Sequence, residues 1–265
     1  VLSYQQTLRI SEETGNEKLR ATALNNIGFI YNEYNNKEKA LEYYYKGLEV
    51  RLNNMDTVGS AKSYNALSLV YCDIDSLDKS LKYSKIALAI FKSREIKENE
   101  SHVLNNIGNI YFRKMQIDSA IIYHKQSLDI RIALDYKLVI SESYKNLAKD
   151  YIALNNYIKA EEFVKLGMIY AKESESKKHL MLLSLLLSEI YEKSGNYKNA
   201  LISFKNFANI QDSILSAESK NKIAELEIQY ETEKKEQQID FLNTKDALNS
   251  KIIHKQKKNQ IILVS

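Results

Sequence analysis

The chain has 265 residues, 44% of them hydrophobic, and it contains no proline, no tryptophan and only seven glycines. So few turn-forming residues exclude a fold of many short strands and tight turns, and they favour an all-helical chain. The formal net charge is only +4, from 38 basic and 34 acidic residues that are interspersed along the sequence, which argues against a nucleic-acid-binding surface.

A pattern of 40 residues repeats five times without insertion or deletion. Its most regular members are a tyrosine, a small residue three positions before it and a small residue nine positions after it. The tyrosines are Tyr31, Tyr71, Tyr111, Tyr151 and Tyr191, and the small residues that precede them are Gly28, Ser68, Gly108, Ala148 and Ser188. A fixed period of this length is typical of a solenoid, in which each unit buries its apolar face against its neighbours.

Each repeat is expected to form two antiparallel helices joined by a short polar turn. Apolar residues recur at helical spacing, as in Leu24, Ile27 and Tyr31, and segments rich in asparagine, aspartate and serine separate the apolar stretches. The predicted first helices lie near 17–33, 57–73, 97–113, 137–153 and 177–193, and the predicted second helices near 37–53, 77–93, 117–133, 157–173 and 197–215. A partial repeat over 1–16 and five repeats near 17–55, 56–95, 96–135, 136–175 and 176–215 would give a solenoid over 1–215.

The stretch ATALNNIGFIYNEYNNKEKALEYYYKGLEV resembles the tetratricopeptide repeat family, and the resemblance covers residues 1 to about 215. It implies an all-α, right-handed solenoid of antiparallel helix pairs whose first helices line a concave groove. The unit is longer than the typical one of about 34 residues, and no proline closes its second helix. Longer units of this kind resemble those of kinesin light chains and bacterial peptide-sensing regulators, which implies a peptide ligand.

Asparagines recur on the predicted first helices, just before the small residue of each repeat. An asparagine side chain carries donors and an acceptor, so a row of them can hold the backbone of an extended peptide regardless of its sequence. The resemblance implies this role for Asn26, Asn106 and Asn146, while Ala66 and Leu186 interrupt the series. The alternative is that the amides tie neighbouring helices together.

Basic residues lie on the same predicted face in the third and fourth repeats, and they indicate a peptide with an acidic residue or a free carboxylate. The residues predicted to line the groove are Asn25, Asn26, Asn65, Asn105, Asn106, Asn109, Arg113, Lys145, Asn146 and Lys149. The expected partner is therefore a peptide or protein in the concave groove, with no nucleic acid bound by this segment.

The sequence has no pattern typical of catalysis, cofactor binding or metal binding. His102, His124, His179 and His254 lie far apart without partners at metal-ligand spacing, and no glycine-rich phosphate-binding motif is present. His124 occupies the repeat position that Tyr44 holds, so we expect it to be a packing residue. We therefore expect this segment not to be an enzyme and to need no cofactor or metal.

After about residue 216 the periodicity changes to a dense mixture of both charges without glycine or proline. We predict one long helix over 216–258. Because Glu233 and Gln237 interrupt its apolar seam, the helix either pairs with a second copy over 217–258 as an interrupted coiled coil or folds back alone on the last repeat. The apolar residues of 259–265 either begin a membrane span or form an apolar tail.

The stretch IAELEIQYETEKKEQQI after a tetratricopeptide array resembles the sensor halves of Bacteroidetes-type membrane regulators, whose outputs are a histidine kinase or a LuxR-like DNA-binding domain. The resemblance implies a peptide- or protein-binding sensor segment of an inner-membrane signalling protein, with the repeats in the periplasm and any kinase domain outside this chain. The lysines before 259 instead favour the cytoplasm for this side of a span. The alternative function is a soluble cytoplasmic scaffold or peptide-sensing regulator.

Overall fold

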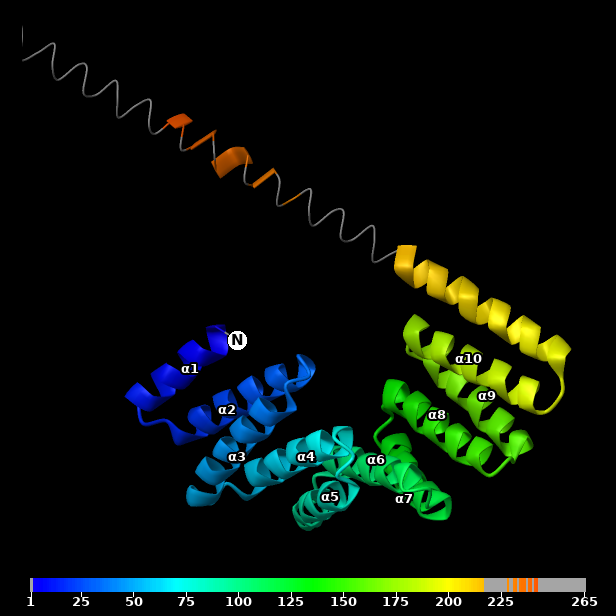
Figure 1. The fold of residues 1–265 in the computed structure, drawn as a ribbon, viewed down its shortest axis with the longest axis horizontal. Coiled ribbons are helices and arrows are strands. Elements are labelled where there is room, and N and C mark those ends of the chain that lie inside the picture. Colours follow the sequence, from blue (N-terminus) through cyan, green and yellow to red (C-terminus); the bar gives the residue numbers. More distant parts are fainter. Residues whose placement is uncertain are drawn as a thin grey trace, which may run out of the picture. The chain divides into compact units, whose positions relative to one another are not determined.

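Figure 1 shows the computed structural model, which describes residues 2–216, 228, 231–232, 234–236, 238–239 and 241–242. Every regular element among these described residues is helical. The chain divides into two compact units, Val1–Ala208 and Asn209–Ser265. Most of the charged helix predicted over 216–258, and all of the segment over 259–265, lie outside the described residues, so those two predictions stay predictions.

The first unit is a series of helix pairs whose bounds repeat every 40 residues. Its helices are α1 (Leu2–Glu13), α2 (Glu17–Glu33), α3 (Lys37–Asn53), α4 (Thr57–Asp73), α5 (Leu77–Ser93), α6 (Lys97–Arg113), α7 (Ile117–Ala133), α8 (Lys137–Ala153), α9 (Tyr157–Glu173) and α10 (Lys177–Lys193). Residues 197–216 are also helical. The predicted helix pairs are thus confirmed, because the apolar spacing and the polar turns together fix where each helix begins and ends.

Two kinds of contact define the architecture of the first unit. Each first helix packs against the second helix of its own repeat, as α2 against α3 and α8 against α9, and each second helix packs against the next first helix. The first helices α2, α4, α6, α8 and α10 also contact one another in succession, whereas no such contacts join the second helices within the described residues. The first helices therefore form the inner layer, which is the side on which a solenoid presents a groove.

In the first and third repeats, the glycine of the first helix faces a large residue of the second helix, whereas Ser68 of α4 hydrogen-bonds to Ser84 of α5. A methyl group added to Gly28 would lie 3.0 Å from Cδ1 of Tyr44, and one added to Gly108 would lie 2.3 Å from Cδ2 of His124. In α8 the small position is Ala148, which like Val164 of α9 is fully buried. The small residue thus matches the volume of its partner, as close packing requires.

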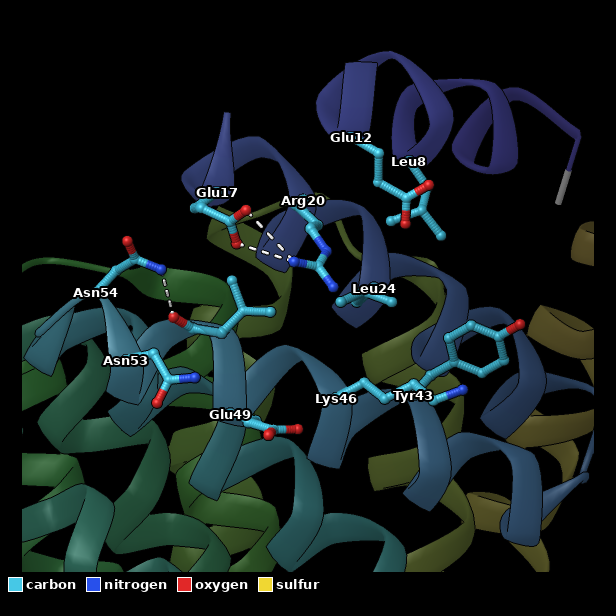
Figure 2. A pocket seen from close by; sticks show the side chains of 11 residues that line it. Leu8, Glu12, Glu17, Arg20, Leu24, Tyr43, Lys46, Glu49, Asn53 and Asn54 are labelled. Carbon is cyan, nitrogen blue, oxygen red and sulfur yellow. Dashed lines mark hydrogen bonds and ion pairs between the residues drawn. The ribbon is translucent and has the colours of Figure 1, made fainter. Parts of the chain in front are cut away.

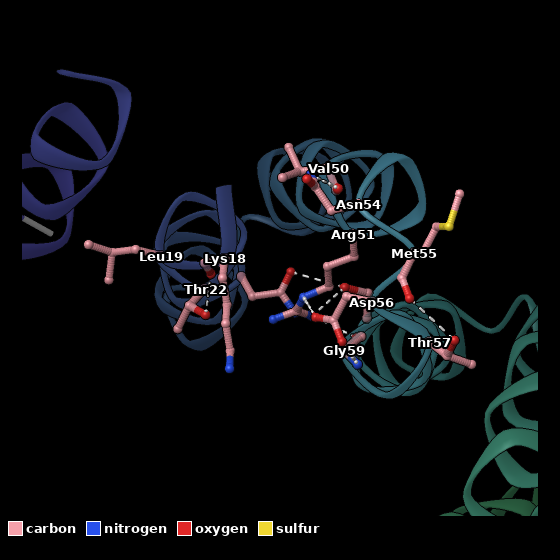
Figure 3. Close-up of polar contacts among 12 residues, drawn as sticks. Lys18, Leu19, Thr22, Val50, Arg51, Asn54, Met55, Asp56, Thr57 and Gly59 are labelled. Atoms are coloured by element: carbon pink, nitrogen blue, oxygen red, sulfur yellow. Dashed lines mark hydrogen bonds and ion pairs between the residues drawn. The ribbon is translucent and has the colours of Figure 1, made fainter. Parts of the chain in front are cut away.

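Two buried arginines connect consecutive repeats at equivalent positions 80 residues apart. Figure 3 shows Arg51 reaching from α3 toward Gly59 of α4, where its Nη1 donates to the Gly59 carbonyl at 2.9 Å and to Ser63 Oγ at 2.6 Å. Arg131 of α7 repeats this arrangement on α8. The intervening position is Phe91, which is also buried, so the junctions alternate between polar and apolar contacts.

Every connection between these helices contains one residue in the left-handed conformation. The ten positions are Gly15, Asn35, Met55, Asp75, Glu95, Met115, Asp135, Asn155, Glu175 and Gly195, with φ between 52° and 76°. Backbone bonds close each helix there; the N–H of Met115 donates to the Phe112 carbonyl at 2.9 Å and that of Gln116 to the Tyr111 carbonyl at 2.9 Å. A non-glycine residue in this conformation costs about 1–2 kcal/mol.

Met115→Gly is therefore expected to raise the free energy of unfolding by about 0.5–1 kcal/mol, the left-handed cost less the entropy cost of glycine. Met115 is 76% exposed, so little packing is lost. Urea unfolding followed by circular dichroism measures the change. Asn35→Gly is the matched control and should gain less, because asparagine tolerates this conformation. A lower stability for the Met115 variant would contradict the expectation.

Candidate functional site

The asparagines predicted to form a row do lie on the inner layer, and several of them bond to the neighbouring first helix. Asn106 Nδ2 donates to Asn65 Oδ1 at 3.0 Å, which links α6 to α4. Asn146 Nδ2 donates to Asn105 Oδ1 at 2.9 Å, which links α8 to α6. The amides therefore tie neighbouring helices together, the structural role that the sequence left open.

These bonds leave part of the amide row available to a ligand. A primary amide has two donor hydrogens and a carbonyl that can accept twice, so one bond between two amides uses only a fraction of their capacity. Asn26, Asn65 and Asn106 are half-buried and reach the surface, whereas Asn105 and Asn146 are buried. Asn25 lies at the α2–α4 contact, where its Oδ1 accepts from Ser63 Oγ at 3.2 Å. Binding of peptide backbone by this row stays a prediction.

A pocket of about 230 Å³ opens between α6 and α8, with α7 beneath it. It brings together four of the residues predicted for the groove with three that were not, namely Asn109, Arg113, Asn146 and Lys149 with Phe112, His124 and Asp150. Asn25, Asn26, Asn65, Asn105, Asn106 and Lys145 are not among its lining residues. The predicted row of residues is thus divided between this pocket and the rest of the inner layer.

A buried hydrogen bond between a histidine of α7 and an aspartate of α8 belongs to this pocket. His124 Nδ1 lies 2.6 Å from Asp150 Oδ2, and its Nε2 lies 3.2 Å from Asn109 Oδ1. The His124 side chain is 2% exposed and that of Asp150 fully buried. Burial raises the pKa of Asp150, while the bond to His124 opposes that rise. His124 is therefore the buried packing residue that the sequence predicted, but it is also part of a polar network.

Sequence reasoning missed Asp150 although the sequence carries a signal for it. At the equivalent position of the other repeats the residue is aliphatic, namely Ile30, Val70, Ile110 and Ile190. A carboxylate in a position that otherwise faces the core is expected to need a partner or to serve a ligand. Comparing each repeat position by position, rather than only its conserved tyrosine and small residues, would have identified it.

The cations of the site differ in how firmly they are held. Arg113 donates to the carbonyl and, at 3.2 Å, to Sγ of Cys72, and its Nη2 lies 3.0 Å from Asp75 Oδ1, so it is fixed to the preceding repeat. Lys145 and Lys149 of α8 have no hydrogen bond or ion pair within the described part of the chain. Burial lowers the pKa of Lys145, the nearby Glu142 opposes this shift, and the charges of Lys149 and Lys178 add to it. A bound anion beside Lys145 and Lys149 would reduce the repulsion between them.

A second pocket, of about 510 Å³, lies between α1, α2 and α3. Figure 2 shows its charged lining, in which Arg20 Nη1 bonds to the Glu17 carboxylate at 3.1 Å and Glu12, Lys46 and Glu49 lie around the opening. None of the predicted groove residues lines it. Residues of the second helices α1 and α3 line it together with residues of α2, so this pocket is separate from the amide row.

No group of three or more histidine, cysteine, aspartate or glutamate side chains among the described residues is placed to hold a metal ion. None of the described helices is both long enough and apolar enough to cross a membrane.

The similarity to curated relatives extends over only part of each relative's length. Outer dynein arm-docking complex subunit 4 of Danio rerio is 22% identical over 153 residues, which are 58% of this chain and 30% of that protein. Response regulator aspartate phosphatase E of Bacillus subtilis (strain 168) is 27% identical over 194 residues, which are 71% of this chain and 49% of that protein. The chain therefore spans at most half of the length of these two relatives.

Solved structures share the fold at low sequence identity. BtubC (BKLC) from P. vanneervenii has a TM-score of 0.71 at 15% identity, over 80% of this chain and 90% of that chain. A Rap protein complexed with Competence and Sporulation Factor has a TM-score of 0.64 at 19% identity, over 76% of this chain and 57% of that chain. The sequence pattern of the tetratricopeptide repeat matches residues 20–53, 59–133 and 99–168. With its repeated helix pairs and inner layer of first helices, this chain belongs to the tetratricopeptide repeat family of protein-binding scaffolds.

Proposed function

We propose that the inner layer of first helices binds an extended peptide that carries an acidic residue or a free carboxylate. The observation that carries this proposal is the row of partly satisfied amides on α2, α4, α6 and α8 beside the unpaired lysines of α8. The amides would bond the peptide backbone, and Lys145 and Lys149 would pair with its carboxylate. The similarity in fold to a Rap protein complexed with Competence and Sporulation Factor supports an occupied groove of this kind.

Selection from a library of random heptapeptides with free carboxyl termini tests the proposal. The wild-type protein is expected to enrich peptides with at least one carboxylate at a fixed position. The double variant Lys145→Ala/Lys149→Ala should bind those peptides about 10- to 100-fold more weakly, since a hydrogen bond to a charged group contributes about 1.5–3 kcal/mol.

The control removes the same charge from second helices. Lys125 on α7 and Lys172 on α9 are exposed, and the variant Lys125→Ala/Lys172→Ala should bind the selected peptides as the wild type does. Equal binding by the α8 double variant would show that the carboxylate does not pair with these lysines. Failure of the wild type to enrich any peptide would overturn the groove proposal itself.

We further propose that this segment is the sensor of a membrane-bound signalling protein and that it lies in the periplasm. The resemblance of IAELEIQYETEKKEQQI to the connector of such regulators supports this assignment. Reporter fusions on either side of residue 265 in the full-length protein test it, and a cytoplasmic repeat array would favour the soluble scaffold instead. Light scattering with and without residues 217–258 tests whether that stretch forms a homodimer.

A further inference from the structure

Asp150, in the floor of the α6–α8 pocket, occupies a position that the fold fills elsewhere with aliphatic side chains. The position of its partner His124 is more variable and holds Tyr44, Ser84, Val164 and Phe204 in the other repeats, so the carboxylate is the exception. A buried pair of polar side chains contributes little to stability on average, because the cost of desolvation offsets its attraction. Packing alone therefore does not account for a carboxylate at this position.

One oxygen of the floor lacks a partner. Asp150 Oδ2 is taken by His124, but Oδ1 is buried and has no hydrogen-bond donor among the described residues. A buried carboxylate oxygen without a donor is costly, and native proteins satisfy nearly all such groups. Asp150 lines the pocket, so an occupant of the pocket is placed to supply this donor.

The rim of the same pocket has the opposite character. Arg113 and Lys149 are both cationic and lie on its two walls, α6 and α8. A bound group would therefore meet a hydrogen-bond acceptor, Asp150, at the floor and hydrogen-bond donors, Arg113 and Lys149, at the rim. Asn146, which already donates to Asn105, adds a further polar group to the α8 wall.

This arrangement discriminates among the side chains that could enter. A carboxylate would bring a second negative charge to Asp150, and an ammonium group would meet Arg113 and Lys149. An apolar side chain would leave Asp150 Oδ1 unsatisfied. A primary carboxamide satisfies both ends, because its NH₂ donates to the floor and its carbonyl accepts from the rim.

We propose that this pocket binds a primary carboxamide, namely the side chain of a glutamine or asparagine residue of the bound peptide. The inference rests on the proposed peptide-binding function, since the peptide supplies the side chain. It adds a second contact beside the carboxylate contact. Lys149 lines the pocket and takes part in both contacts, whereas Lys145 is not among the lining residues and serves the carboxylate alone. A pocket of about 230 Å³ is large enough for one side chain of this size.

Capped single residues test the pocket independently of any peptide. The probes are the N-acetyl methylamides of glutamine and glutamate, which differ only at the side-chain tip, and those of lysine and leucine, which carry an ammonium group and an apolar side chain. Binding is followed by the NMR signal of His124 in histidine-labelled protein, assigned by its loss in His124→Gln. The glutamine probe should shift this signal saturably and bind at least tenfold more tightly than the other three.

Two variants report on the two ends of the pocket. Lys149→Glu changes an exposed rim residue, and it should shift the preference at least tenfold toward the lysine probe. Asp150→Ile copies the aliphatic residue of the other repeats, and it should abolish the glutamine shift while circular dichroism shows the helical content retained. Lys125→Ala, on the outer side of α7, is the control and should leave the preference unchanged.

The outcomes separate this inference from the groove proposal. Equal or tighter binding of the glutamate probe, or no saturable shift with any probe, overturns the carboxamide site even when the library selects peptides. A glutamine-specific shift in a protein that selects no peptide supports the pocket and rejects the groove. An unchanged preference in both Lys149→Glu and Asp150→Ile would show that the probe binds elsewhere, which also overturns the inference.

Discussion

Arg131→Ala is expected to lower the free energy of unfolding by about 2–4 kcal/mol, because it leaves a cavity and unsatisfied acceptors at a buried junction. The side chain of Arg131 is 1% exposed, and its Nη1 donates to the Val139 carbonyl at 3.0 Å and to Ser143 Oγ at 2.8 Å. Truncation removes these bonds and leaves a cavity at the junction of α7 with α8. Denaturant unfolding followed by circular dichroism measures the loss.

Two other arginines serve as comparisons for Arg131→Ala, one at an equivalent buried position and one exposed. Arg51→Ala should cost a similar amount, because Arg51 makes the equivalent bonds to Gly59 and Ser63 at the junction of α3 with α4. Arg94 follows α5, is exposed and makes neither bond, so Arg94→Ala should change stability by less than about 0.5 kcal/mol. A loss below about 1 kcal/mol for Arg131→Ala would show that the junction depends on its apolar contacts instead.

The second large effect is expected at the contact between α6 and α7. Gly108→Ala should destabilise the protein by about 1–3 kcal/mol, as overpacking of a close-packed core does. A glycine-to-alanine change inside a helix ordinarily stabilises it by up to about 1 kcal/mol. Here the added methyl group would lie 2.3 Å from Cδ2 and 2.9 Å from Cγ of His124, so the whole ring must shift from its bond with Asp150.

A triple variant provides the matched test of that explanation. Gly108→Ala/His124→Val/Asp150→Ile copies the residues that the next repeat has at the same three positions, Ala148, Val164 and Ile190, all of which are buried. We expect it to be at least as stable as the wild type, because apolar residues that replace a buried polar pair remove the cost of its desolvation and leave no polar atom unsatisfied. A triple variant less stable than Gly108→Ala alone would mean that the His124–Asp150 pair stabilises the fold.

The positions of the helices follow from the sequence because the same local pattern recurs in every repeat. The pattern combines apolar residues at helical spacing, a small residue as in α6 and α8, and polar turns every 20 residues. All three favour one arrangement, and the helix bounds confirm it. The left-handed residues at the turns are less evident, since Met55 and Met115 have no intrinsic preference for that conformation. Their conformation follows from the helix ends on both sides.

The binding residues depend more on tertiary contacts than the helices do. The sequence places Asn105 and Asn146 on one face, but whether each amide is used by its neighbour or left for a ligand depends on the distance between α6 and α8, and there the two amides bond to each other. Arg113 likewise belongs to the predicted face, yet its guanidinium is held by Cys72 and Asp75 of the preceding repeat.

The 40-residue period therefore determined the solenoid, its helix pairs and the layer in which the asparagines lie, because periodicity is a local property of the chain. Only the tertiary structure decided that His124 of α7 meets Asp150 of α8 beneath Asn109, and that one oxygen of Asp150 is left without a donor. That outcome depends on side chains 26 residues apart in the sequence whose separation in space is set by helix packing, and no local pattern encodes it.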